Sequence, residues 1–130
     1  MAQKKLEPGE VVNLYSLKKD MPEDATLALM KTSDMEVIRM VLPKDKAITE
    51  HSVDGEVSVQ CLEGKTEFTV AGETHVLSSG DWLYLSRNQP HSLRVIRDTI
   101  LLVTILFVGN SQHDLSLRKR NSGHYCSWVN

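Results

Sequence analysis

Several features that mark specialised classes of protein are scarce in this chain of 130 residues. Aromatic residues make up only 5% of it, and the formal net charge is −2. A nucleic-acid backbone requires a basic face, and bases stack on aromatic side chains. We therefore expect no nucleic-acid partner.

Cysteine is also scarce, and no apolar run is long enough to span a membrane. The two cysteines, Cys61 and Cys126, are too few and too far apart to suggest a disulfide framework. The longest apolar run, residues 99–108, is shorter than the roughly 20 residues that cross a bilayer. The N-terminus lacks the apolar segment of a secretory signal. We expect a protein of the reducing cytoplasm without a membrane partner.

What the sequence does contain is a series of short segments with strand character. They alternate in hydrophobicity or are rich in apolar residues, and glycine, proline or charged residues separate them. These segments are residues 10–17, 25–32, 35–42, 57–64, 65–72, 73–77, 81–86, 91–97 and 99–108. Links that contain glycine predict antiparallel hairpins, with turns at Glu63-Gly64 and Ala71-Gly72. The pattern predicts an all-β sandwich or barrel.

The sequence becomes mainly polar after Val108. We predict a single barrel domain over residues 1–108 and a polar C-terminal tail over residues 109–130. The tail ends in a segment with Tyr125 and Trp128. It is either partly ordered, or docked through these aromatics on the barrel or on a partner subunit.

Two histidines are the first candidates for chemistry. His51 and His91 each lie where a strand segment begins, forty positions apart. In a closed barrel, strands that are distant in sequence line one cavity, so both side chains can converge there. Two imidazoles alone are a weak metal signal, because closed metal sites generally have three or four protein ligands.

The stretch 40–108 resembles a small single-domain cupin of the RmlC-like superfamily. The second cupin motif begins with a glycine and ends with a histidine, and Gly80 and His91 match these positions. Ser86 and Asn88 stand where that motif has its proline and its second glycine. The resemblance implies a double-stranded β-helix, the jelly-roll or cupin barrel.

The first cupin motif is degenerate. Gly64 matches its closing glycine, and counting back places His51 at its first histidine. Val53 stands at the second histidine and Val57 at the glutamate. Of the four metal ligands of the family, the resemblance therefore retains His51 and His91.

The strand after His51 sets the wall of the expected pocket. Val57, Val59 and Cys61 share one parity, and we expect them to face the interior beside the two histidines as ligand-binding residues. Glu56 and Gln60 have the opposite parity and face inward only if a bulge reverses them.

Three functions stay open. The first is a module that binds a small organic ligand in the barrel between His51 and His91, without a tightly held metal. The second is a metal-dependent cupin enzyme of the dioxygenase or isomerase type. Its iron, manganese, nickel or zinc ion would be held by both histidines and completed by Gln60, His75, Glu56 or water. The third is a metal-free enzyme in which His91 is the general acid or base.

We also expect a homodimer, because cupins of this size commonly share edge strands. The candidate shared strands are residues 35–42 and the N-terminal strand segment.

Overall fold

The computed structural model describes residues 5–15 and 26–107, and within these ranges all regular secondary structure is β-strand. The strands are β1 (Leu27–Lys31), β2 (Met35–Leu42), β3 (Ala47–His51), β4 (Glu56–Val70), β5 (Glu73–Ser78), β6 (Trp82–Leu85) and β7 (His91–Leu106). Every pairing between them is antiparallel, which confirms the predicted all-β class. No helix in the described residues is long and apolar enough to cross a membrane.

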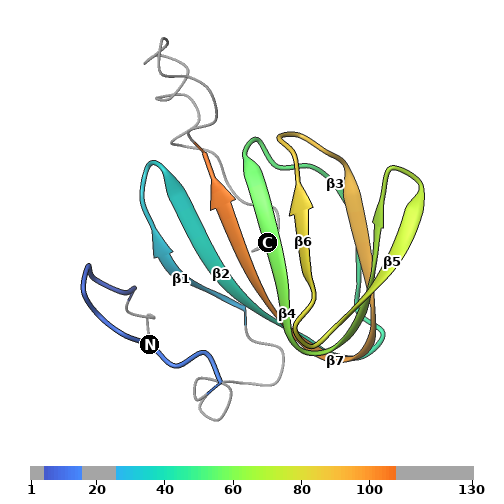
Figure 1. Cartoon of the computed structure of the whole chain (residues 1–130), viewed down its shortest axis with the longest axis horizontal. Helices are drawn as coiled ribbons and strands as arrows, with labels where there is room; N and C mark the ends of the chain where they lie inside the picture. The colour runs from blue at the N-terminus through green and yellow to red at the C-terminus, as the bar shows by residue number, and fades with distance from the viewer. Residues whose placement is uncertain (1–4, 16–25, 108–130) are drawn as a thin grey trace.

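Two long strands organise the fold. β4 and β7 pair with each other from one end to the other, in the sheet order β1-β2-β7-β4-β5. Both strands curve at the bottom of Figure 1, so that their two halves face each other as two layers. β6 extends one layer by pairing with the first half of β4, and β3 extends the other by pairing with the first half of β7. This arrangement is the predicted jelly-roll barrel.

The bend in these strands corrects two expectations. A hairpin turn at Glu63-Gly64 and a break at Asp98 were predicted, but the chain continues through both points as a single strand. Gly64 adopts φ +101°, and the β4–β7 register shifts on both sides of it. A Cβ atom there would lie 2.2 Å from the Asp98 carbonyl oxygen. Glycine therefore permits the close approach at which both strands bend.

The remaining predicted strands and turns are partly confirmed and partly corrected. β2 has the predicted bounds, and Ala71 and Gly72, both at positive φ, form the turn between β4 and β5. β3 was not predicted, because its exposed residues show no alternation. The described part of the N-terminal segment, residues 10–15, is not a strand. Its remainder and the predicted C-terminal tail lie outside the described residues.

The core lies between the two layers and forms as the alternation predicted. Val57, Val59 and Cys61 face inward and are at most 1% exposed. Phe68 and Leu93 meet them from the other layer within the same buried cluster. β4 and β7 each start and finish at the same end of the barrel (Figure 1). We call this end the barrel mouth.

The structure leaves the expected shared strand little open edge. β2 pairs with β7 along Met35–Leu42 and with β1 over Glu36–Arg39. Most backbone groups of this strand are therefore already used within the chain. The dimer itself stays a prediction.

Candidate functional site

The structure brings the two candidate histidines together at the barrel mouth. His51 is the last residue of β3, His91 is the first of β7, and the two are directly paired. Their ring centroids are 4.3 Å apart, with the ring planes inclined by 62°. Paired residues of neighbouring strands point to the same face of the sheet. His91 is 2% exposed, so the pair lies on the inner face.

Backbone carbonyls fix the tautomer of both rings. His51 Nδ1 donates a hydrogen bond to the Thr49 carbonyl oxygen at 3.0 Å, and His91 Nδ1 donates to that of Gln89 at 2.8 Å. A carbonyl oxygen only accepts, so each Nδ1 carries a proton. In a neutral imidazole the lone pair is then on Nε2. Both Nε2 atoms are buried, and the site therefore presents two acceptor nitrogens.

The surroundings of His91 keep it neutral. The pKa of His91 is lowered to about 4, chiefly by burial; the Gln89 carbonyl opposes this shift and the neighbouring His51 adds to it. At neutral pH His91 is therefore a hydrogen-bond acceptor. A general acid or base works best when its pKa is near the working pH, so this environment is unfavourable for that role of His91.

The walls beside the histidines are apolar. The Phe68 ring stacks against His91, with centroids 5.9 Å apart and planes inclined by 20°. Val53 is 6% exposed and Val57 is 1% exposed. Both valines stand where the cupin motif has metal ligands. An apolar wall therefore lies where chelating groups would be needed.

The two loops that carry the motif positions are tied to each other. Arg87 Nε donates a hydrogen bond to Asp54 Oδ1 at 2.6 Å, and Asn88 N donates to the Val53 carbonyl oxygen at 2.9 Å. The Arg87–Asp54 contact is an ion pair at one quarter exposure. These contacts connect the loop after His51 to the loop before His91, and so hold the two imidazoles in place.

The residues present do not fit the metal centre of the family. In residues 5–15 and 26–107, no group of three or more His, Cys, Asp or Glu side chains is placed to hold an ion. The match at the four family positions is limited to His51 and His91. Metal affinity depends on the number and geometry of the ligands, so two imidazoles do not make a tight closed site.

Gln60 and Glu56 are not brought to the histidines. Gln60 pairs with Trp82 and with Leu102, on the face of the sheet opposite to Val59 and Cys61. The first register shift of β4 comes after Cys61, so no bulge turns Gln60 inward. Glu56 lies on the same outer side and accepts a hydrogen bond from the Tyr84 hydroxyl at 2.6 Å. Gln60 is therefore not retained as a candidate ligand.

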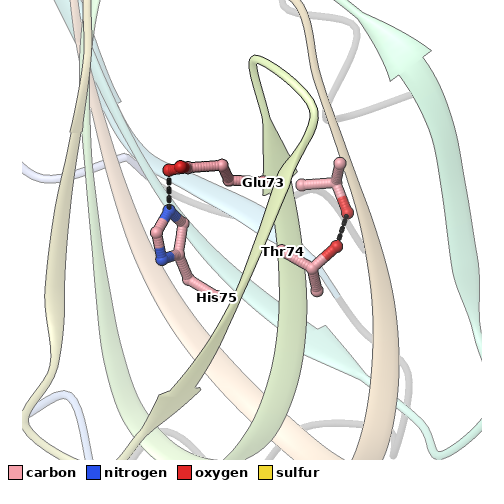
Figure 2. Close-up of polar contacts among 4 residues, drawn as sticks. Glu73, Thr74 and His75 are labelled. Carbon is pink, nitrogen blue, oxygen red and sulfur yellow. Dashed lines mark hydrogen bonds and ion pairs between the residues drawn. The ribbon is translucent and has the colours of Figure 1, made fainter.

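His75 lies at the rim of the barrel and not beside the pair. It is opposite Phe68, on strand β5 at the edge of the sheet, and its side chain is 50% exposed. Figure 2 shows its ring directed toward Glu73, with Nε2 3.8 Å from Oε1, while Thr74 lies on the other face of the strand. His75 does not join His51 and His91 in a group able to hold a metal.

Cys61 lies deep in the barrel, near the bend. Burial raises the pKa of its thiol, and Sγ donates a hydrogen bond to the Glu63 carbonyl oxygen at 3.5 Å. Burial therefore keeps the thiol protonated and also shields it from solvent. Cys61 is a core residue without nucleophilic character. Along β4, Val57 is nearest the barrel mouth, whereas Val59 and Cys61 lie progressively deeper.

Sequence reasoning missed Glu36, an acidic residue on the inner face. It lies on β2, is 3% exposed and is paired with Ile105, which is itself paired with Val57. The available signal was an acidic residue at a core-facing position of a largely apolar strand.

Comparisons with known proteins agree with this architecture. The family model for the cupin domain matches residues 38–108. A cupin superfamily protein from Desulfitobacterium hafniense has 18% identity and a TM-score of 0.67, with 82% of this chain and 98% of that chain covered. A conserved protein of unknown function from Streptococcus pyogenes has 24% identity and a TM-score of 0.66, with coverage of 79% and 91%.

More distant structural neighbours include enzymes. The polyketide cyclase RemF from Streptomyces resistomycificus has 16% identity and a TM-score of 0.57, with 63% of each chain covered. At this identity the likeness concerns the fold alone. A comparison with curated protein sequences finds no match. Because the family model covers more than half of the sequence, and the fold is that of its structural neighbours, this chain belongs to the cupin domain family.

Proposed function

We propose that this cupin binds a small organic molecule at the barrel mouth, through hydrogen bonds to the Nε2 atoms of His51 and His91. The observation that carries the proposal is the fixed tautomer of both rings, which directs two neighbouring acceptors to the inner face. Fixed acceptors favour binding because little conformational freedom is lost when the ligand arrives.

The chemistry of the walls defines the class of ligand. Two imidazole acceptors require two hydrogen-bond donors, such as hydroxyl groups on one carbon skeleton. Phe68 stacks on His91, and Val57 and Val53 share its buried cluster, so these are the apolar side chains available to that skeleton. A few placed polar groups on an apolar wall are typical of small-molecule sites. A hydroxylated compound without a large charged group fits this pattern best.

Binding of small hydroxylated compounds tests the proposal. A panel of polyols, hydroxy ketones and hydroxy acids is titrated against the protein with saturation-transfer NMR. We expect at least one compound to bind, and the H51A/H91A variant to lose affinity for it by tenfold or more. The H75A variant is the matched control and should keep its affinity. If no compound of the panel binds, or if both variants bind as the wild type does, the proposal is wrong.

A two-histidine metal centre is the second candidate, and one observation favours it. Histidines that bind metal usually donate their other ring nitrogen to a carbonyl or carboxylate oxygen, as His51 and His91 do. The number of ligands argues against a resident ion. Elemental analysis of protein purified without a metal affinity step decides between the metal-free site and the metal centre. Stoichiometric iron, manganese, nickel or zinc would overturn the metal-free form of the proposal.

Metal-free catalysis by His91 stays a weaker alternative, because burial lowers the pKa of this residue to about 4. A turnover that the H91Q variant loses, with the binding affinity unchanged, would favour catalysis over binding alone.

A further inference from the structure

Glu36 lies on the layer of the barrel that faces the histidines. Along one cross-strand row, Glu36 is paired with Ile105 and Ile105 with Val57. Residues paired in this way share a face, and Ile105 and Val57 are at most 1% exposed. The Glu36 side chain is therefore on the inner face. Two strand spacings separate it from Val57, a distance of about 10 Å.

The carboxyl group of Glu36 is buried and incompletely satisfied. The residue is 3% exposed, and its Oε1 atom is buried without a hydrogen-bond partner. A buried polar atom without a partner costs about 1–3 kcal/mol, more if it is charged. Such an atom in a folded protein calls for an explanation, and a carboxyl group at the barrel mouth is placed to meet a ligand.

Burial of this carboxyl favours its protonated form. Burial raises the pKa of Glu36, and the positive charges of Lys31 and Lys5 oppose the shift in part. Lys31 is directly opposite Glu36 on β1, and Lys5 lies on the N-terminal segment. On the β7 side the neighbour is Ile105, which carries no charge. A protonated carboxyl donates a hydrogen bond, which neither imidazole Nε2 atom can do while it is neutral.

We infer that Glu36 is a ligand-binding residue of the barrel and donates a hydrogen bond to a carbonyl oxygen of the bound molecule. This inference rests on the proposed function. The ligand then carries hydroxyl groups toward His51 and His91 and a carbonyl group toward Glu36. A hydroxylated ketone or aldehyde has this combination, and a simple polyol does not.

A matched pair of probes separates the two contributions. L-Erythrulose and erythritol have the same four-carbon chain, but only erythrulose has a ketone. We expect wild-type protein to bind erythrulose at least tenfold more tightly than erythritol. The E36A variant should lose that preference through weaker binding of erythrulose, with less than twofold change for erythritol. The E36Q variant keeps a donor at the same position and should retain most of the preference.

Controls and a second readout keep the test decisive. Glu73 is an exposed glutamate at the rim, and E73A should behave as the wild type. If E36A does not fold, the ¹³C chemical shift of the Glu36 carboxyl is followed against pH in wild-type protein. Erythrulose should then raise the apparent pKa of Glu36, because it binds the protonated form.

The outcomes distinguish this inference from the proposed function. If erythritol and erythrulose bind equally, and E36A changes neither, Glu36 is not a ligand-binding residue although the histidine site stands. If the histidine variants also leave binding unchanged, the proposed function fails as well. A Glu36 carboxyl that erythrulose does not perturb likewise overturns the inference.

Discussion

Backbone carbonyls orient the imidazoles of His51 and His91. Each accepting carbonyl belongs to the residue two positions earlier, so each ring is held by its own strand end. The pair needs no carboxylate partner to fix its tautomer. This explains how the site geometry persists although Val53 and Val57 stand at the other two ligand positions of the family.

Burial of a neutral His91 makes stability depend on pH. The pKa of His91 is about 4 in the folded protein and 6.5 as its ordinary value. Between these values the unfolded chain binds more protons, so the free energy of unfolding falls as pH falls from about 6.5 to 4. The loss contributed by His91 reaches about 3 kcal/mol. Urea denaturation at several pH values should show a shallower loss for H91Q.

The H75Q variant is the control for this measurement, because His75 is half-exposed at the rim. Its unfolding curve should follow that of the wild type across the same pH range. An H91Q variant that also follows the wild type would mean that His91 is not kept neutral by burial.

At the scale of elements, the bend of β4 is the feature on which the barrel depends. Gly64 combines φ +101° with a position where a Cβ atom would collide with the Asp98 backbone. We expect G64A to lower the free energy of unfolding by about 3 kcal/mol or more, because backbone strain and overpacking act together. Chemical denaturation measures the change.

Gly72 supplies the matched control. It has φ +80° in the turn between β4 and β5, but no atom lies within 4 Å of its added Cβ. The G72A variant should therefore lose only about 1 kcal/mol. Equal effects of the two variants would show that the bend does not require a glycine.

The two valines at former ligand positions should decide metal affinity. The V53H/V57E variant adds an imidazole and a carboxylate to the pair that is already in place, which gives the four donors of the family pattern. We expect it to bind Ni²⁺ or Zn²⁺ with at least hundredfold higher affinity than the wild type, measured by isothermal titration calorimetry. Adding H91A should remove the gain. Wild-type protein that binds the ion as tightly as the variant would contradict this interpretation of Val53 and Val57.

The alternation of apolar and polar residues predicted most of the strands, but it predicted fewer of the connections between them. β2 and the β4–β5 turn were predictable because hydrophobic period and turn residues agree there. The bend at Gly64 was not, because a glycine between two apolar segments suits either a reversal or a kink. The pairing of the two histidines followed from motif register. The inward position of Glu36 depends on a cross-strand row through Ile105 to Val57, which only the fold creates.

At the scale of the whole molecule, one outer surface is unusually apolar. Trp82, Tyr84 and Leu106 are 61%, 51% and 44% exposed and line a shallow groove with Glu56. An exposed apolar patch on a sheet is typical of an interaction site. The predicted homodimer can use this outer face, because β2 is paired with β7 throughout and with β1 over Glu36–Arg39.

Sedimentation analysis tests the dimer. We expect wild-type protein to be dimeric at micromolar concentration and the W82R/L106K variant to be monomeric. Val76 is 49% exposed on β5, away from this surface, and V76K should remain dimeric. Wild-type protein that sediments as a monomer would contradict the homodimer prediction.

The protonation pattern of the two central rings is directly observable. A long-range ¹H–¹⁵N NMR spectrum at neutral pH distinguishes protonated from unprotonated ring nitrogens, and the H51Q and H91Q variants assign the signals. The structure predicts a proton on Nδ1 of both rings, and a neutral His91 with its lone pair on Nε2. A proton on Nε2 of either ring, or a charged His91, would contradict the proposal that this barrel presents two acceptors to a hydroxylated ligand.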